Sequence, residues 1–309
     1  MSSCASPADH SLINGSEFNG SEFNGSDMSQ EMTSSARTGS LKLIDPRRIA
    51  RRGAFSVAEA RLRNMWKFFW VIAFDALANP MLYLVSVGIG IGALVDENLG
   101  SSGVGGVPYL TFIAPALLAT TAIQGAMDEV VFPSLDGFKW QKTYFAMNST
   151  PLSPRQIATG VFLAAVTRTI FAVTCYWLLL YLFGALDSPT SWLAIPVAIL
   201  AGAGFGALML GFVSFVENED LFLTVINRLV IMPMFLFSGT FYPLSNMPIF
   251  LQPIGWVSPL WHATELGRFL TYDYPLALPM AVLHIAVMLG LLVGGLTWAF
   301  KNFERRLAK

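Results

Sequence analysis

The sequence contains little charge, few cysteines and few histidines. Asp, Glu, Lys and Arg make up only 13% of the 309 residues, against about 25% in an average soluble domain. Cys4 lies in a polar N-terminal segment and Cys175 in a long apolar run, so we expect no disulfide. His10, His262 and His284 are scattered along the chain without the spacing of metal ligands. We therefore expect no metal site.

Motifs for nucleotide hydrolysis are also missing from the sequence. No lysine follows a glycine, which excludes the phosphate-binding loop G-x-x-x-x-G-K-S/T. The sequence predicts a chain that is not an enzyme, has no catalytic residues and binds neither ATP nor Mg itself. We expect no nucleic-acid partner either.

Long apolar runs fill most of the chain after the first 75 residues. Hydrophobic residues make up 54% of the sequence and the mean hydropathy is +0.56. About 20 apolar residues cross a bilayer as one helix, so these runs predict an all-α membrane protein with six transmembrane helices. The predicted spans are residues 76–95, 107–127, 157–183, 192–216, 221–242 and 276–300.

Lysine and arginine lie almost entirely on one side of these runs. Sixteen of the 19 fall before residue 76, between 128 and 156, or after 300. Such residues concentrate on the cytoplasmic side of membrane proteins. We therefore expect a multi-pass protein of the plasma (inner) membrane with both termini in the cytoplasm. The acidic turn 217–220 is an exception, but acidic residues contribute little to this bias.

Two different segments precede the first span. Residues 1–45 repeat the pattern Asn-Gly-Ser-Glu-Phe and contain few large apolar side chains, which predicts a disordered cytoplasmic tail before a membrane domain of residues 46–309. Phe55, Ala58, Leu62, Met65 and Phe69 then recur at steps of three and four, which predicts an amphipathic helix in the cytoplasmic interface. This helix either only anchors the first span or acts as a lever that touches a cytoplasmic partner.

Charged residues within or beside the predicted spans are candidates for ion pairs. A membrane-buried arginine costs about 2.5–3.5 kcal/mol on insertion scales and normally faces the bundle interior with a partner. We expect Glu129 or Glu217 to pair with Arg168. The pairs either lock helices together or take a direct part in transport. The candidates are Asp75, Glu129, Arg168, Glu217 and Arg228.

Glycines spaced four residues apart recur in three of the predicted spans. Small residues at this spacing allow close contact between membrane helices. The pairs are at positions 88 and 92, 202 and 206, and 290 and 294.

The loop after the second span carries a more specific pattern. Residues 136–147 predict a short amphipathic helix, and Thr-Pro-Leu-Ser-Pro-x-x-Ile-x-x-Gly follows from Thr150 to Gly160. Pro151 and Pro154 stiffen the connection and restart the chain into the third span. The run closely resembles the cytoplasmic loop of type-2 ABC exporter permeases, whose preceding coupling helix docks in a groove of the ATPase subunit. The resemblance implies coupling roles for Phe138, Lys139, Trp140, Lys142 and Tyr144.

A second match follows the fifth span. The runs 237–248 and 259–268 resemble the signature of the same superfamily, nearest to the nodulation-factor and daunorubicin-type exporter permeases. This resemblance implies short re-entrant helices at the outer leaflet before the last span. The prolines there interrupt any continuous helix, and the tryptophans and tyrosines suit a membrane interface. The implied gate residues are Phe241, Pro243, Pro259, His262, Glu265 and Arg268.

Taken together, the two resemblances imply the permease subunit of an ABC exporter. Its partners would be two separate ATP-binding subunits, which bind the ATP and Mg, and a second permease copy in a homodimer or a dimer with a similar permease. The substrate would be an amphiphile, either a drug, a glycolipid or a polysaccharide, moved outward along a path that the spans open. Membrane lipid would be a further partner. A secondary transporter or channel is the alternative, against which stand the missing intramembrane carboxylate chain and inverted repeat. The second alternative is a membrane-embedded lipid-modifying enzyme, which would need clustered His, Asp or Glu at one interface.

Overall fold

The computed structural model describes residues 46–99, 104, 106–216 and 225–308. These residues belong to one helical unit, Asp45–Lys309. Within them the only β pairing is an isolated bridge between Val104 and Val107. The predicted tail, residues 1–45, lies outside the described residues and stays a prediction.

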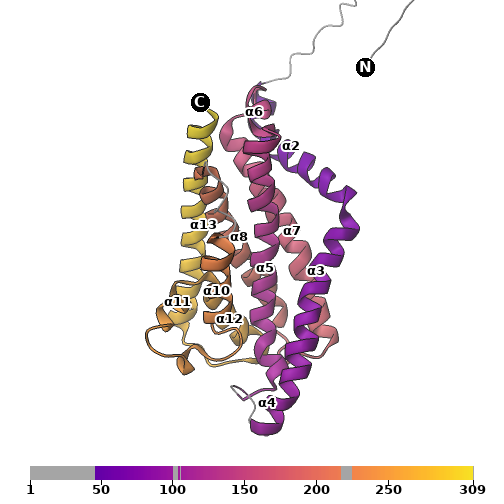
Figure 1. Cartoon of the computed structure of the whole chain (residues 1–309), viewed down its shortest axis with the longest axis vertical. Coiled ribbons are helices and arrows are strands. Elements are labelled where there is room, and N and C mark those ends of the chain that lie inside the picture. Colours follow the sequence, from indigo (N-terminus) through magenta and orange to yellow (C-terminus); the bar gives the residue numbers. More distant parts are fainter. Residues whose placement is uncertain (1–45, 100–103, 105, 217–224, 309) are drawn as a thin grey trace, which may run out of the picture. The chain divides into compact units, whose positions relative to one another are not determined.

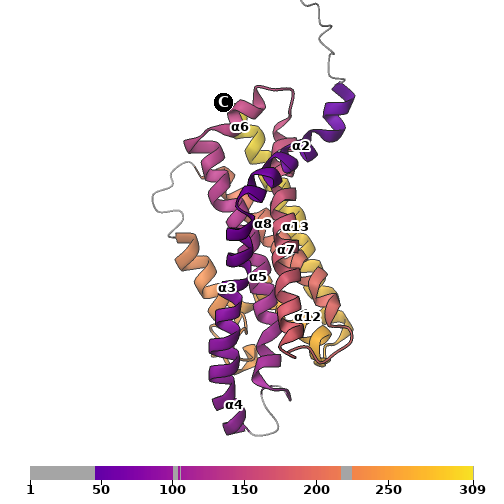
Figure 2. The same ribbon diagram turned by 90° about the vertical axis from the view of Figure 1, so that its right-hand side faces the viewer.

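Five helical stretches among the described residues are long and apolar enough to cross a membrane. Figures 1 and 2 show them running side by side. The first consists of α3 (Phe69–Tyr83), the π-helical η1 (Leu84–Ile91) and α4 (Gly92–Leu99). The others are α5 (Tyr109–Leu135) with the π-helical η3 (Asp136–Trp140), α7 (Pro154–Leu182), the 3-10 turn η4 (Ser191–Leu193) with α8 (Ala194–Phe215), and α13 (Leu278–Leu307).

The predicted fifth span, 221–242, is described only in part, and its crossing of the membrane stays a prediction. Residues 221–224 lie outside the described part. From there the chain forms two short segments, η5 (Ile226–Ile231) and α10 (Met232–Phe237), of six residues each. The helix ends at Ser238 because Gly239 adopts a positive φ of 73°, a backbone conformation typical of a helix C-terminus.

Short helices connect α10 to α13, and others lie at the opposite end of the bundle. The 3-10 turn η6 (Leu244–Asn246), α11 (Gln252–Val257) and α12 (Pro259–Tyr272) follow α10. We call this end of the bundle the α12 end. The other end, the α6 end, holds α6 (Thr143–Asn148) and the C terminus of α13 (Figure 1). Insertion of α11 and α12 into a membrane stays a prediction.

The predicted amphipathic helix is present as α2 (Pro46–Lys67), and part of its surface is buried against the protein. Phe55 is 68% exposed, whereas Val57 and Ala58 are buried. Val57 faces Gly160 of α7 so closely that a Cβ on this glycine would lie 2.5 Å from the Val57 Cβ. Helix α2 therefore packs against the start of α7 in addition to any contact with a membrane surface.

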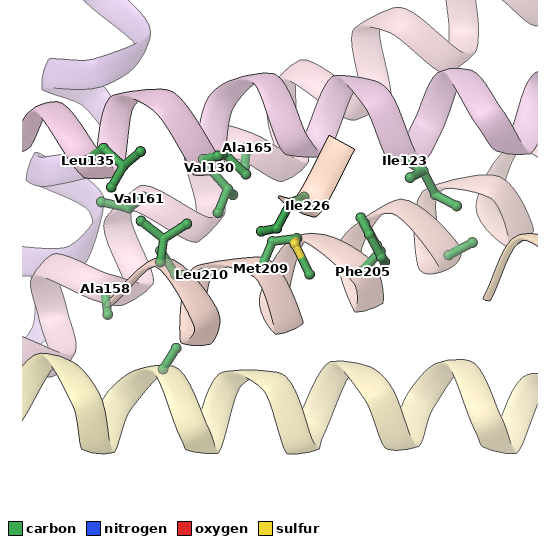
Figure 3. Packing of buried hydrophobic residues seen from close by; sticks show 14 of the residues in the cluster. Ile123, Val130, Leu135, Ala158, Val161, Ala165, Phe205, Met209, Leu210 and Ile226 are labelled. Atoms are coloured by element: carbon green, nitrogen blue, oxygen red, sulfur yellow. The ribbon is translucent and has the colours of Figure 1, made fainter. Parts of the chain in front are cut away.

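The core forms where α5, α7 and α8 meet. Ile123, Val130 and Leu135 of α5 lie across from Phe205 and Leu210 of α8 (Figure 3). Between membrane helices such side chains stabilise the bundle by van der Waals packing, because lipid tails are as apolar as the core. This core fixes the positions of the helices that carry the charged residues.

Two of the glycines allow helices to touch at the backbone. A Cβ on Gly202 would lie 2.5 Å from the carbonyl oxygen of Ala122 in α5, and one on Gly295 would lie 2.5 Å from the backbone nitrogen of Leu208 in α8. Gly290 and Gly294, which the sequence pattern had singled out, have no atom within 4 Å of such a Cβ. The predicted contact face of α13 was therefore wrong, and its neighbour Gly295 forms the contact.

Candidate functional site

Arg61 of α2 connects three separate segments near the α6 end. Its Nη1 donates to Oε1 of Glu129 in α5 over 2.9 Å, and its Nη2 donates to the carbonyl oxygen of Pro133 over 3.4 Å. The same Nη2 donates to the phenol oxygen of Tyr144 in α6. Tyr144 in turn donates to Ser134 over 3.4 Å, and burial raises the pKa of Tyr144, so the phenol stays neutral. One guanidinium therefore holds α2, α5 and α6 together.

Arg61 was missed at the sequence level. It was counted among the basic residues before the first span, yet its side chain is only 15% exposed. The available signal is its spacing: Arg61 follows the buried Val57 and Ala58 by four and three residues, which puts it on the same helix face. The sequence therefore places Arg61 on the buried face of α2 once Val57 and Ala58 are known to form that face.

Arg168 of α7 is the second cation of the site, and the expected partner Glu129 is one of three carboxylates around it. Its Nη2 lies 3.1 Å from Oδ2 of Asp128 and 3.4 Å from Oδ2 of Asp75, whereas its Nη1 is 3.9 Å from Oε2 of Glu129. Glu129 instead forms its shorter pair with Arg61. Consecutive residues of a helix point about 100° apart, so Asp128 faces α7 while Glu129 faces α2. Glu217, the other expected partner, lies outside the described residues.

We call Arg61, Asp75, Asp128, Glu129, Arg168 and Tyr144 the charged network. It carries three carboxylates and two guanidiniums, contributed by α2, α3, α5 and α7. Of the remaining sequence candidates, Arg228 of η5 is exposed and forms no ion pair with any residue that the structure describes. The structure therefore brings Asp75, Glu129 and Arg168 together and leaves Arg228 apart.

A cavity of about 220 Å³ opens beside the network. Asp75 and Asp128 line it with side chains about half exposed, at 53% and 48%, next to the 15% exposed Arg168. Apolar side chains such as Ile72 and Ile231 complete the wall. A smaller pocket shares Pro80, Thr121 and Gln124 with it and continues along α5. Polar groups inside an apolar bundle are typical of substrate or ion paths in membrane proteins.

The predicted coupling helix is not one continuous helix. The chain forms η3, turns at Lys142 with a φ of 52°, and then forms α6. Phe138 is 3% exposed and Tyr144 0%, and each ring packs against Phe303 of α13, at centroid distances of 4.8 and 5.6 Å. The expectation that these two rings fill a groove in a partner was therefore wrong, since their own chain buries them.

Other residues of this segment remain at the surface. Trp140 is 47% exposed, and its ring lies 5.1 Å from that of Phe132. Lys142 is exposed and Lys139 partly so. These three residues, and not the buried pair, lie at the surface of this segment.

The predicted gate residues gather at the α12 end. Pro259 begins α12, Pro243 precedes η6, and the Phe241 carbonyl accepts a hydrogen bond from Tyr109 over 3.2 Å. Arg268 is only 2% exposed. Its Nη1 donates to Glu265 over 2.8 Å and its Nη2 to the carbonyl of Gly239 over 2.6 Å.

Two histidines that seemed scattered in the sequence form a buried pair. The Nδ1 atoms of His262 and His284 lie 2.6 Å apart, and Nε2 of His262 lies 3.0 Å from the Trp256 carbonyl. If Nε2 of His262 carries the proton and donates to the Trp256 carbonyl, Nδ1 of His262 is an acceptor. Nδ1 of His284 then donates to Nδ1 of His262. Burial and the neighbouring ring lower the pKa of His262 to about 4. No group of three metal-ligating side chains occurs among the residues that the structure describes.

Comparison with known proteins identifies relatives along most of the chain. The family model described as ABC-2 type transporter matches residues 54–272. Nodulation protein J of Rhizobium leguminosarum bv. viciae is 31% identical over 216 residues, which cover 69% of this chain and 78% of that protein. Nodulation protein J of Bradyrhizobium diazoefficiens is 25% identical over 233 residues, covering 75% and 86%.

A relative with a different printed function also matches. The probable multidrug ABC transporter permease YbhR of Escherichia coli K12 is 28% identical over 165 residues, which cover 52% of this chain and 43% of that protein. The family match spans the charged network, the coupling segment and α12. The chain therefore belongs to the ABC-2 type transporter family, as a membrane permease.

Proposed function

We propose that this permease exports an amphiphilic substrate, driven by two separate ATP-binding subunits that dock at the α6 end. Its family implies ATP-binding partner subunits. The relative named for multidrug transport supports a drug, and a glycolipid or a polysaccharide is the alternative substrate class. The α6 end would face the cytoplasm and the α12 end the outside of the plasma membrane, in agreement with the concentration of basic residues at the former.

One observation carries the proposal: Arg61 contacts both the coupling segment and the network beside the cavity. Through Tyr144 it reaches α6, and through Glu129 it reaches a carboxylate that also lies 3.9 Å from Arg168. Arg168 pairs with the cavity-lining Asp75 and Asp128. A displacement of α6 would therefore alter the ion pairs of the cavity wall through only Tyr144, Arg61 and Glu129.

ATP drives such a change only if the partner subunits bind differently to two states of the permease. Small displacements at an effector site become discrete rearrangements when charged groups exchange partners across packed helices. We propose that Arg61 and Arg168 share Glu129 in one state and separate in the other. A second permease copy, identical or similar, would complete the transporter.

Transport by purified components tests the proposal. A tagged chain is isolated with its ATP-binding subunit, and inside-out vesicles are assayed with a fluorescent glycolipid and a fluorescent hydrophobic drug. We expect ATP-dependent accumulation of at least one probe, which is lost when the ATP-binding lysine of the partner is replaced. Accumulation driven by an imposed proton gradient without ATP would show a secondary transporter instead.

A matched pair of arginines on α2 tests the coupling role. Arg61→Gln should uncouple the transporter, with ATP hydrolysis retained and transport reduced about tenfold, since hydrogen bonds to a charged group contribute about 1.5–3 kcal/mol. Arg63→Gln is the control, because Arg63 pairs only with Glu59 on the surface of the same helix. Equal transport by the two variants would remove Arg61 from the mechanism.

Cysteine labelling tests the proposed orientation. Ser245 at the α12 end and Ser149 at the α6 end are both exposed. An impermeant thiol reagent added to intact cells should label Ser245→Cys and leave Ser149→Cys unlabelled. The reverse pattern would invert the topology.

A further inference from the structure

A second cavity, of about 280 Å³, lies at the α12 end. It is close in size to the lower limit of small-molecule sites, about 300 Å³. Trp256, Trp261 and Tyr274 supply aromatic walls, and Gln252, Glu265 and Arg268 supply polar groups. None of its lining residues belongs to the charged network or to the cavity beside it.

Arg268 gives this cavity a fixed cation with an unused donor. Its side chain is 98% buried, rests 4.0 Å above the Phe112 ring and is held by Glu265 and Gly239. Its Nε is buried and has no hydrogen-bond partner among the described residues. Leaving such a donor unsatisfied is unfavourable. The guanidinium therefore keeps a positive charge beside the cavity that its own chain satisfies only in part.

The charges of the cavity select among ligands. Arg268 and Glu265 form an ion pair of 2.8 Å, so the lining carries one positive and one negative group and no net charge. A simple anion would be repelled by Glu265, and a simple cation by Arg268. A net-neutral ligand with separated opposite charges matches both groups.

The aromatic walls indicate where the positive part of that ligand would lie. A cation over the face of a tryptophan or tyrosine is attracted by the ring quadrupole, and quaternary ammonium groups are recognised in this way. Trp256 is 51% exposed, although tryptophan is a costly side chain to leave facing solvent, and the nearby Trp261 and Tyr274 are partly exposed. The phosphate would then lie beside the guanidinium of Arg268 and accept from the hydroxyl groups of Ser245 and Tyr274, which line the same cavity.

We propose that the cavity formed by Gln252, Trp256, Trp261, Glu265, Arg268 and Tyr274 binds the zwitterionic headgroup of a membrane phospholipid. The phosphate lies at Arg268, and the ammonium group lies between Glu265 and the aromatic rings. The bound lipid ties η6, α11 and α12 to the surrounding bilayer. This site is independent of the exported substrate and of ATP.

Binding to the permease alone tests the site. The chain is reconstituted in nanodiscs of phosphatidylglycerol and titrated with glycerophosphocholine, glycerol 3-phosphate, choline or glucose, with tryptophan fluorescence as the readout. We expect a saturable change with glycerophosphocholine only. A response to glucose alone or choline alone would overturn the zwitterion assignment. Phosphatidylcholine added to the nanodiscs should abolish the response to glycerophosphocholine, and failure to compete would exclude a lipid as the source.

Two variants test the assigned roles while keeping Arg268 in place. Trp256→Leu should weaken glycerophosphocholine binding about tenfold, whereas the control Trp192→Leu, at a tryptophan 57% exposed and outside the cavity, should not. Glu265→Gln keeps an acceptor for Arg268 but leaves the cavity positive, so preference should move to glycerol 3-phosphate. Unchanged ligand preference in Glu265→Gln would contradict the proposal. These binding measurements use the permease without its ATP-binding subunits. The proposed lipid site can therefore fail while the proposed ATP-driven export stands, and the reverse.

Discussion

The two ends of the bundle hold buried arginines in opposite ways. At the α12 end, Arg268 pairs with Glu265 three residues earlier on the same helix, and the two side chains are 2% and 16% exposed. Toward the α6 end, Arg168 pairs with residues from α3 and α5, whose side chains are about half exposed. A pair within one helix moves as a unit, whereas pairs between helices break when the helices shift. The comparison assigns a static role to Arg268 and an adjustable one to Arg61 and Arg168.

Removal of Arg268 should have the largest effect on stability. Arg268→Met leaves Glu265 and the Gly239 carbonyl without their partner in a buried site, and breaking one side of a buried pair costs about 3–5 kcal/mol. Thermal unfolding in detergent should show this loss. Glu265→Gln, which keeps an acceptor for Nη1, should lose far less. Equal stability of Arg268→Met and the parent would show that this end is not fixed by the arginine.

The coupling segment provides a second contrast, between a buried ring and an exposed one. Phe138→Ala should destabilise the permease by about 3–5 kcal/mol, because the ring fills the core against Tyr144 and Phe303. Trp140→Ala should leave the unfolding temperature unchanged but weaken association with the ATP-binding subunit, as loss of an exposed aromatic anchor does. Copurification yields distinguish the two. If Trp140→Ala still associates with the ATP-binding subunit as the parent does, the docking surface does not include η3.

The Arg168 pairs should contribute less than the Arg268 pair. Arg168→Leu leaves Asp75 and Asp128 without a cation, but both are about half exposed and partly hydrated, so we expect a loss of about 1–2 kcal/mol. The double variant Arg168→Leu with Asp128→Asn should regain part of the stability that Arg168→Leu loses. Glu129→Gln should not restore it, because Glu129 keeps its shorter pair with Arg61. Rescue by Glu129→Gln alone would reverse the assignment of partners.

Helix positions were largely readable from the sequence, whereas the pairing of charges was not. The apolar runs located α5, α7, α8 and α13, and Pro154 begins α7 with Ser153 as its capping residue. Both motif resemblances fell within the matched family region. The fifth apolar segment was expected to end at residue 242, but its helix ends at Phe237 because Gly239 has a positive φ. The hydrophobicity of a run does not predict such a backbone angle.

Contacts between distant helices account for the remaining errors. Whether Asp128 or Glu129 meets Arg168 depends on which neighbours surround α5, and a single sequence does not contain that information. The left-handed conformation of Lys142 turned Phe138 and Tyr144 inward against α13. His262 and His284 meet because α12 packs on α13, although 22 residues separate them.

The histidine pair should give the α12 end a modest dependence on pH. In the folded protein the pKa of His262 is lowered to about 4, whereas an unfolded histidine titrates near 6.5. Below pH 6.5 the unfolded chain therefore binds more protons than the folded one, so stability falls as the pH decreases toward 4 and is fully present above 6.5. Unfolding temperatures measured between pH 7.5 and 4 should show this decline. His262→Gln, which keeps a hydrogen-bonding group near the Trp256 carbonyl, should flatten the decline, and an unchanged slope in that variant would assign the acid sensitivity to other groups.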